Sequence, residues 1–160
     1  MNNSELFTKL PLDAWKSQLN QANKLIDGFT DEQLNEEIAP GRNTVLYILG
    51  HLTAVSDNLI PLLGFGEKKR PELFEIFIKN PDKSSLQKPT AKQLREDWKQ
   101  INAFITSKLE ALTPDQWLEK HTSVSEEDFK KEPHRNKLNV VLGRTNHLAY
   151  HVGQLALIKK

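Results

Sequence analysis

Two segments of the sequence indicate the fold most clearly: WKSQLNQANKLIDGFTDEQ (residues 15–33) and WKQINAFITSKLEALTPDQ (residues 98–116). They align with each other when one is shifted by 83 positions. Trp, Lys, Thr and Gln recur at matching positions. In each segment apolar residues return every three or four positions, which is the spacing of one face of an α-helix. Thr30 and Thr113 each stand three residues before a Gln, the pattern of a helix capping box. The repeat predicts a long helix followed by a short capped helix, twice over.

The helical spacing continues on both sides of these segments. It predicts long amphipathic helices over about residues 12–28, 45–61, 90–112 and 138–159. Asn43 or Thr44 is expected to cap the second long helix, because short polar side chains favour that position. That helix should end between Pro61 and Gly64.

Residues 64–89 interrupt the helical pattern with Gly, Pro and Ser. Five apolar residues in this stretch are too many for a free linker: Leu73, Phe74, Ile76, Phe77 and Ile78. We expect a long crossover with one short ordered piece packed on the body, so the helices that it joins need not be antiparallel. A polar loop is expected over about residues 119–137. Together these features predict an all-α fold, a four-helix bundle formed by a single domain over residues 1–160.

Composition narrows the functional classes. The chain of 160 residues has 22 Lys and Arg against 21 Asp and Glu, a net charge of +1, so no charge excess favours nucleic acid or an anionic membrane. The N-terminal sequence lacks the basic start and apolar run of a signal peptide, and we expect no membrane-spanning window. A cytoplasmic protein is the resulting expectation. Because the chain has no Cys, any metal must be held by nitrogen and oxygen ligands.

The strongest chemical signal is HLAYHVGQ at residues 147–154. On a helix His147 and His151 lie one turn and about 40° apart, so both imidazoles can reach one cation. The alternative is that these two histidines bind no metal and are hydrogen-bonded or partly exposed side chains. His51, in the second long helix near the edge of its apolar face, could supply a third ligand across the bundle. Three protein ligands leave positions open, as in catalytic metal sites. His121 and His134 fall in the polar loop, where solvated roles are expected.

The chain resembles the DinB-like superfamily of metal-binding four-helix proteins over essentially its whole length. The resemblance rests on short motifs: Gly50-His51-Leu52 after Asn43-Thr44-Val45, Pro89-Thr90 with Trp98, and His147-x-x-x-His151-x-Gly153-Gln154. It implies a divalent ion, zinc or nickel, held by His51, His147 and His151. The known chemistry of such proteins includes transfer of low-molecular-weight thiols such as bacillithiol, and mycothiol-dependent isomerisation.

Three polar residues are expected near the histidines, each with a structural alternative. Arg144, one turn before His147, could bind an anionic substrate or form an ion pair with a neighbouring helix. Gln154 could hydrogen-bond a ligand or pack a helix contact. Tyr47, one turn before His51, could present its hydroxyl to the site or serve as an ordinary half-buried tyrosine.

The leading hypothesis is a metal-dependent enzyme that transfers a low-molecular-weight thiol to an electrophile. The alternatives are a metal-dependent hydrolase and a non-catalytic metal- or ligand-binding bundle, which could be a homodimer. The expected partner is a small molecule, with neither nucleic acid nor membrane. Beyond the three ligands, no catalytic residue is assigned.

Overall fold

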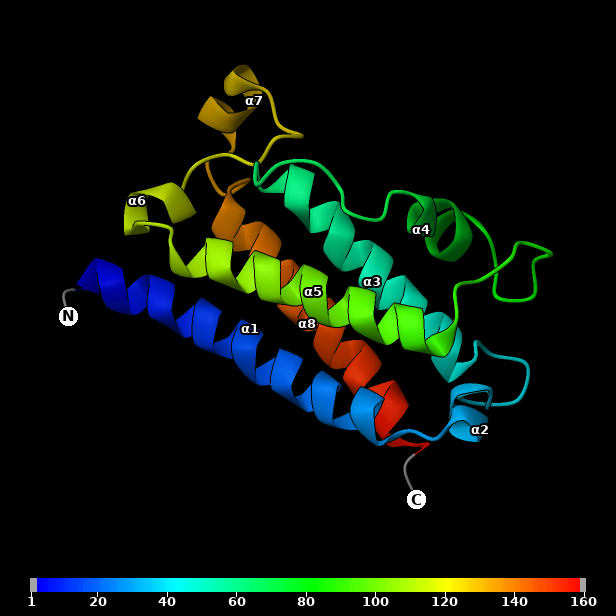
Figure 1. Ribbon diagram of the computed structural model, residues 1–160. Helices are drawn as coiled ribbons and strands as arrows, with labels where there is room; N and C mark the ends of the chain where they lie inside the picture. Colours follow the sequence, from blue (N-terminus) through cyan, green and yellow to red (C-terminus); the bar gives the residue numbers. More distant parts are fainter. Residues whose placement is uncertain (1–2, 159–160) are drawn as a thin grey trace.

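Long helices form an all-α bundle in the computed structural model, which describes residues 3–158 (Figure 1). They are α1 (Asn3–Gly28), α3 (Val45–Leu62), α5 (Ala91–Glu110) and α8 (Lys137–Ala156). The all-α prediction is confirmed. The expected last helix extended to Lys159, which lies outside the described residues, whereas α8 ends at Ala156.

The predicted caps are present at both short helices. They are α2 (Asp31–Leu34), capped by Thr30, and α6 (Pro114–Trp117), capped by Thr113. In each, the Thr hydroxyl accepts from the backbone N–H of the Gln three residues later, and that Gln side chain accepts from the Thr backbone. Thr44, of the two expected candidates, caps α3. Each capping box satisfies two helix-terminal donors locally, which is why it could be read from the sequence.

Two boundaries differ from the sequence prediction. α1 begins at Asn3 rather than near residue 12, and Pro11 lies inside it. Its buried face starts only at Pro11, and the apolar residues of the first turns, Leu6, Phe7 and Leu10, are exposed. The expected polar loop contains α7 (Glu126–Lys131), which buries none of its residues. α7 is instead stabilised by its Ser125 cap, an acidic first turn and a basic last turn, which complement the helix dipole.

The crossover makes α3 and α5 parallel. Along the chain α1 runs one way, α3 and α5 run back, and α8 returns in the direction of α1 (Figure 1). α1 packs most extensively on α8, and α3 on α5. Between α3 and α5 the chain forms α4 (Glu72–Phe74) and the π-helical turn η1 (Glu75–Lys79), both in contact with α3. The predicted ordered piece of the crossover therefore exists and lies on the bundle.

The sequence repeat appears as a pseudo-twofold contact between α1 and α5. Trp15 Nε1 donates to Thr106 Oγ1 at 3.2 Å, and its repeat partner Trp98 donates through Nε1 to Asn23 Oδ1 at 2.8 Å. Since Asn23 and Thr106 are also 83 residues apart, the two bonds are the same contact seen from either half. Two ion pairs obey the same relation: Lys16 with Glu110, and Lys99 with Asp27. Both Trp side chains are buried, as the apolar stripes predicted.

α3 corrects one expectation drawn from the sequence. By length and composition it is apolar enough to cross a membrane, although no such segment was expected. Within the described chain 72% of it is buried in the bundle, and its neighbours α5, α4 and η1 account for that burial. Its apolar character is thus that of a core helix.

Gly50 allows the crossover to lie directly on α3. A Cβ at this position would stand 2.3 Å from the ring of Phe77, which is 0% exposed and has no room to move. We therefore expect Gly50→Ala to lower the free energy of unfolding by about 1–3 kcal/mol in urea denaturation, in spite of alanine's higher helix propensity. Gly143 in α8 is the matched control because nothing lies within 4 Å of its Cβ position. Gly143→Ala should raise stability by about 0.5–1 kcal/mol. Equal stability of the two variants would contradict this account of the packing.

Candidate metal centre

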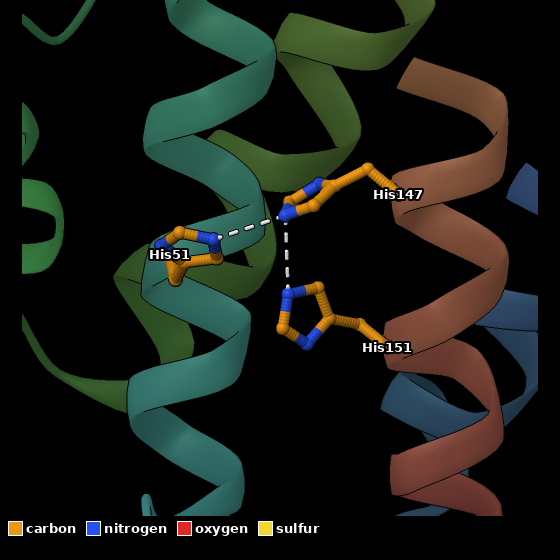
Figure 2. Close-up of side chains that lie close together, drawn as sticks. All are labelled: His51, His147 and His151. Atoms are coloured by element: carbon orange, nitrogen blue, oxygen red, sulfur yellow. Dashed lines mark hydrogen bonds between the residues drawn. The ribbon is translucent and has the colours of Figure 1, made fainter. Parts of the chain in front are cut away.

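The three histidines come together between α3 and α8. His51 projects from α3 toward His147 and His151, which lie one turn apart on α8 (Figure 2). The Nε2 atom of His147 is 3.3 Å from Nε2 of His51 and 3.2 Å from Nε2 of His151. All three ligand atoms lie within 4.8 Å of one another, and all three side chains are half-buried. The predicted convergence on one point is thus present in the structure.

Oxygen acceptors orient two of the rings. Nδ1 of His51 is 3.1 Å from the carbonyl oxygen of Phe77, and Nδ1 of His151 is 2.7 Å from Oε1 of Gln154. A carbonyl oxygen only accepts, so in both rings Nδ1 carries the proton and donates it. The lone pairs of these rings then lie on Nε2, directed at the common point. Partners of this kind orient the histidine ligands of metal sites.

The environment keeps the imidazoles neutral. Burial lowers the pKa of His147 to about 4, and the charges of His151, His51 and Arg144 act in the same direction. Burial likewise lowers the pKa of His51 and of His151. Since only the neutral imidazole ligates a cation, near neutral pH the triad is in the form that binds metal.

The donor set fits a divalent cation. Imidazole nitrogens bound at about 2.0–2.1 Å in a tetrahedral arrangement stand about 3.3–3.4 Å apart. Two of the three separations, at 3.3 and 3.2 Å, are close to that value, and the third, between His51 and His151, lies within 4.8 Å. Three nitrogens do not complete a tetrahedron, which leaves a position for an exchangeable molecule. No carboxylate joins the metal-ligand group found among residues 3–158.

Tyr47 contacts the crossover. Its hydroxyl is 2.5 Å from the carbonyl oxygen of Asn80 and 3.3 Å from that of Phe77, the oxygen that also accepts from His51. Tyr47 therefore helps to hold the backbone segment that orients His51. A role in substrate binding stays a prediction. The sequence pattern did not reveal the contribution of Phe77, because a backbone carbonyl supplies it.

Gln154 and Arg144 lie on either side of the α8 histidines. Gln154 contacts His151 through Oε1 and donates through Nε2 to the Tyr150 hydroxyl at 3.0 Å. Arg144 is half-buried beside His147, and burial lowers its pKa. The ion pair considered as its alternative role is absent among the described residues, where the structure gives Arg144 no acidic partner. An anion-binding role for Arg144 stays a prediction.

The remaining histidines lie apart from the triad. His121 accepts through Nδ1 from the backbone N–H of Ser123 at 3.3 Å, and His134 is exposed in the segment before α8. Neither belongs to the metal-ligand group.

A hollow of about 620 Å³ adjoins the triad at His151. The segment between α2 and α3 forms one wall with Arg42 and Asn43, and α8 forms the other with Tyr150, His151 and Gln154. Its volume is in the range of small-molecule sites. A second hollow of about 470 Å³, between α1 and α5, contains none of the three histidines.

The lowered pKa values predict how the metal-free protein responds to acid. The unfolded chain binds protons near pH 6.5, whereas folded His147 binds them near pH 4, so the unfolded state takes up more protons between these values. The triad's contribution is therefore fully present above about pH 6.5 and is lost as the pH falls toward 4. Because solvent screens a half-buried site, we expect a loss on the order of 1 kcal/mol. Urea denaturation between pH 7 and 4.5 should show a smaller loss in His147→Asn than in wild type or His134→Asn.

Comparison with known proteins identifies the family. The model of the DinB superfamily matches residues 14–155, a range that includes all three histidines. The search of curated proteins found no match. The superfamily is a metal-binding one, and the clustered triad suggests a divalent metal site in this member as well. The match covers most of the chain and agrees with the all-α bundle and the motifs around the triad, so the chain belongs to the DinB superfamily.

Proposed function

We propose that His51, His147 and His151 hold a divalent ion through Nε2, and that the protein is an enzyme that uses this ion to transfer a low-molecular-weight thiol to an electrophile. The observation that carries the proposal is the convergence of the three Nε2 atoms, with Nδ1 protons of His51 and His151 bound to oxygen. Zinc and nickel are the ions that we propose, since both accept imidazole ligands.

The ion would act as a Lewis acid that lowers the pKa of a bound thiol or water. The protein supplies the rest of the site. Phe77 and Gln154 orient two ligand rings, and the hollow, which could hold a small molecule, borders the triad at His151. Arg144 carries a positive charge close to His147, which favours the thiolate over the neutral thiol.

The chemistry of the hollow favours thiol transfer over hydrolysis. A metal-dependent hydrolase commonly uses a carboxylate as general base, yet no Asp or Glu lines the hollow in the described part of the chain. A thiol needs no such base once its pKa is lowered. A non-catalytic bundle in which the ion is only structural gives no role to the hollow of about 620 Å³, whereas a non-catalytic ligand-binding bundle would use it. A hydrolase and a non-catalytic bundle remain the competing functions.

The proposal also covers the cellular compartment of the protein and the kind of partner it binds. We propose a cytoplasmic protein with a small-molecule partner and with neither nucleic acid nor membrane, because the net charge of +1 gives no overall excess of positive charge to attract a polyanion. A homodimer stays a prediction.

Alanine substitutions test the ligand assignment. His51→Ala, His147→Ala and His151→Ala should each lower metal affinity by at least about tenfold to a hundredfold, the effect of losing even an outer partner of a ligand. His121→Ala and His134→Ala are the matched controls and should bind metal like wild type. Elemental analysis and metal titration of protein purified without a His tag provide the measurement. Full stoichiometry and affinity in any of the first three variants would remove that residue from the site.

A thiol should enter the open position. In cobalt(II)-loaded protein, addition of a small thiol should produce a sulfur-to-metal charge-transfer band in the near-ultraviolet. His147→Ala, tested at the same cobalt concentration, should show little of the band because it holds the ion weakly. A fully loaded wild-type protein without the band would count against thiol transfer and leave the hydrolase and the non-catalytic bundle.

A further inference from the structure

The charges of the residues around the triad indicate which class of substrate the site binds, an inference that rests on the proposed function. The chain has 21 acidic residues, yet among the described residues none lines the hollow at His151 or the small space where Arg144 meets His147. Imidazoles bring no negative charge to the site, and the ion would add two positive charges. A site of this kind attracts anions and disfavours cations.

The arginines divide into two groups. Arg70, Arg95 and Arg135 each form an ion pair with a carboxylate. Arg42 and Arg144 have no acidic partner among residues 3–158. These two are also the arginines beside the triad: Arg42 lines the hollow at His151, and Arg144 lies against His147. Arg42 is exposed and faces the hollow of about 620 Å³, whereas Arg144 borders a space of only about 10 Å³, which has no room for a ligand.

A tight turn holds Arg42 at the rim of the hollow. The turn has Pro40 in its second position and Gly41 in its third, with φ of +74° at Gly41 and a bond of 2.9 Å from Arg42 N to Ala39 O. This is the pattern of a type II turn, which proline restricts and which glycine adopts without strain. Glu37, which precedes this turn, is already engaged: its carboxylate accepts from Gly41 N at 2.6 Å and pairs with Lys83 at 2.8 Å. The carboxylate near Arg42 is thus used to fix the turn.

We infer that the substrate held at the triad carries a carboxylate, and that Arg42 is the specificity-determining residue that binds it in the hollow beside His151. The substrate class is then a small molecule with a thiol and a carboxylate on one skeleton, the sulfur directed to the histidines and the carboxylate to the guanidinium. Arg42 offers paired N–H donors that match a carboxylate, and the fixed turn reduces the entropy lost on binding.

Two thiols of equal length test the inference. Cobalt(II)-loaded protein is titrated with 4-mercaptobutanoate, which is anionic, and with 4-mercapto-1-butanol, which is neutral, and the charge-transfer band gives each Kd. In Arg42→Gln the Kd for 4-mercaptobutanoate should rise about tenfold while that for the alcohol stays constant, since a charge-assisted bond is worth on the order of 1.5 kcal/mol. Arg135→Gln is the matched control and should behave like wild type. A direct contact of the carboxylate with cobalt would be present in both wild type and Arg42→Gln. It would therefore not change the ratio of their Kd values.

A thiol-free measurement separates failure of the inference from failure of the proposed function. Butanoate added to zinc-loaded protein should shift the NMR signals of Arg42, Asn43 and Gln154 saturably, and should shift those of Asn43 and Gln154 much less in Arg42→Gln. If neither thiol yields the band but butanoate still binds in this way, thiol transfer fails and the carboxylate site stands. If both thiols bind and Arg42→Gln keeps the wild-type ratio of Kd values, or if butanoate leaves these signals unchanged, the inference is overturned.

Discussion

The contact between the crossover and α3 is the constraint on which the site depends. α3 and α5 run parallel, so the chain must travel the length of the bundle between them, and this connection returns along α3 rather than through solvent. Gly50 removes the side chain that would block the return, and Phe77 fills the space with its ring. The backbone of that same residue then accepts the Nδ1 proton of His51. The contact between Gly50 and Phe77 thus contributes both to the stability of the core and to the orientation of the His51 ring.

The scaffold is close to symmetric, whereas the site is not. The Trp–Asn and Trp–Thr bonds between α1 and α5 are equivalent under the repeat, and so are the caps of α2 and α6. Under the shift of 83 residues His51 corresponds to His134, which does not belong to the triad. The repeat therefore supplies a rigid frame, and the ligands are additions to it.

Much of the fold could be predicted because it is encoded locally. Apolar spacing marked the long helices, and capping boxes marked α2 and α6. The start of α1 and the whole of α7 were not predicted; α7 buries none of its residues, and the apolar residues at the start of α1 are exposed and precede Pro11. Among the site residues, the helical period placed His147 and His151 on one face, but no period sets the register of α3 against α8. The position of His51 near the apolar face of its helix made it a candidate third ligand, and the family resemblance implied the full set of three. The roles of Phe77 and Arg42 come from backbone geometry and from the absence of a partner, neither of which the sequence displays.

The pairing of α1 with α8 also sets an order of events during synthesis. α1 is made first and its main partner α8 last among the described helices, and α8 carries two of the three histidines. At about 5–20 residues per second, the end of α8 is translated roughly 5–20 seconds after the end of α3. Until then the nascent chain holds only His51 of the triad, and the part of α1 that packs on α8 is uncovered. A site that uses all three histidines can therefore form only after α8 has been made.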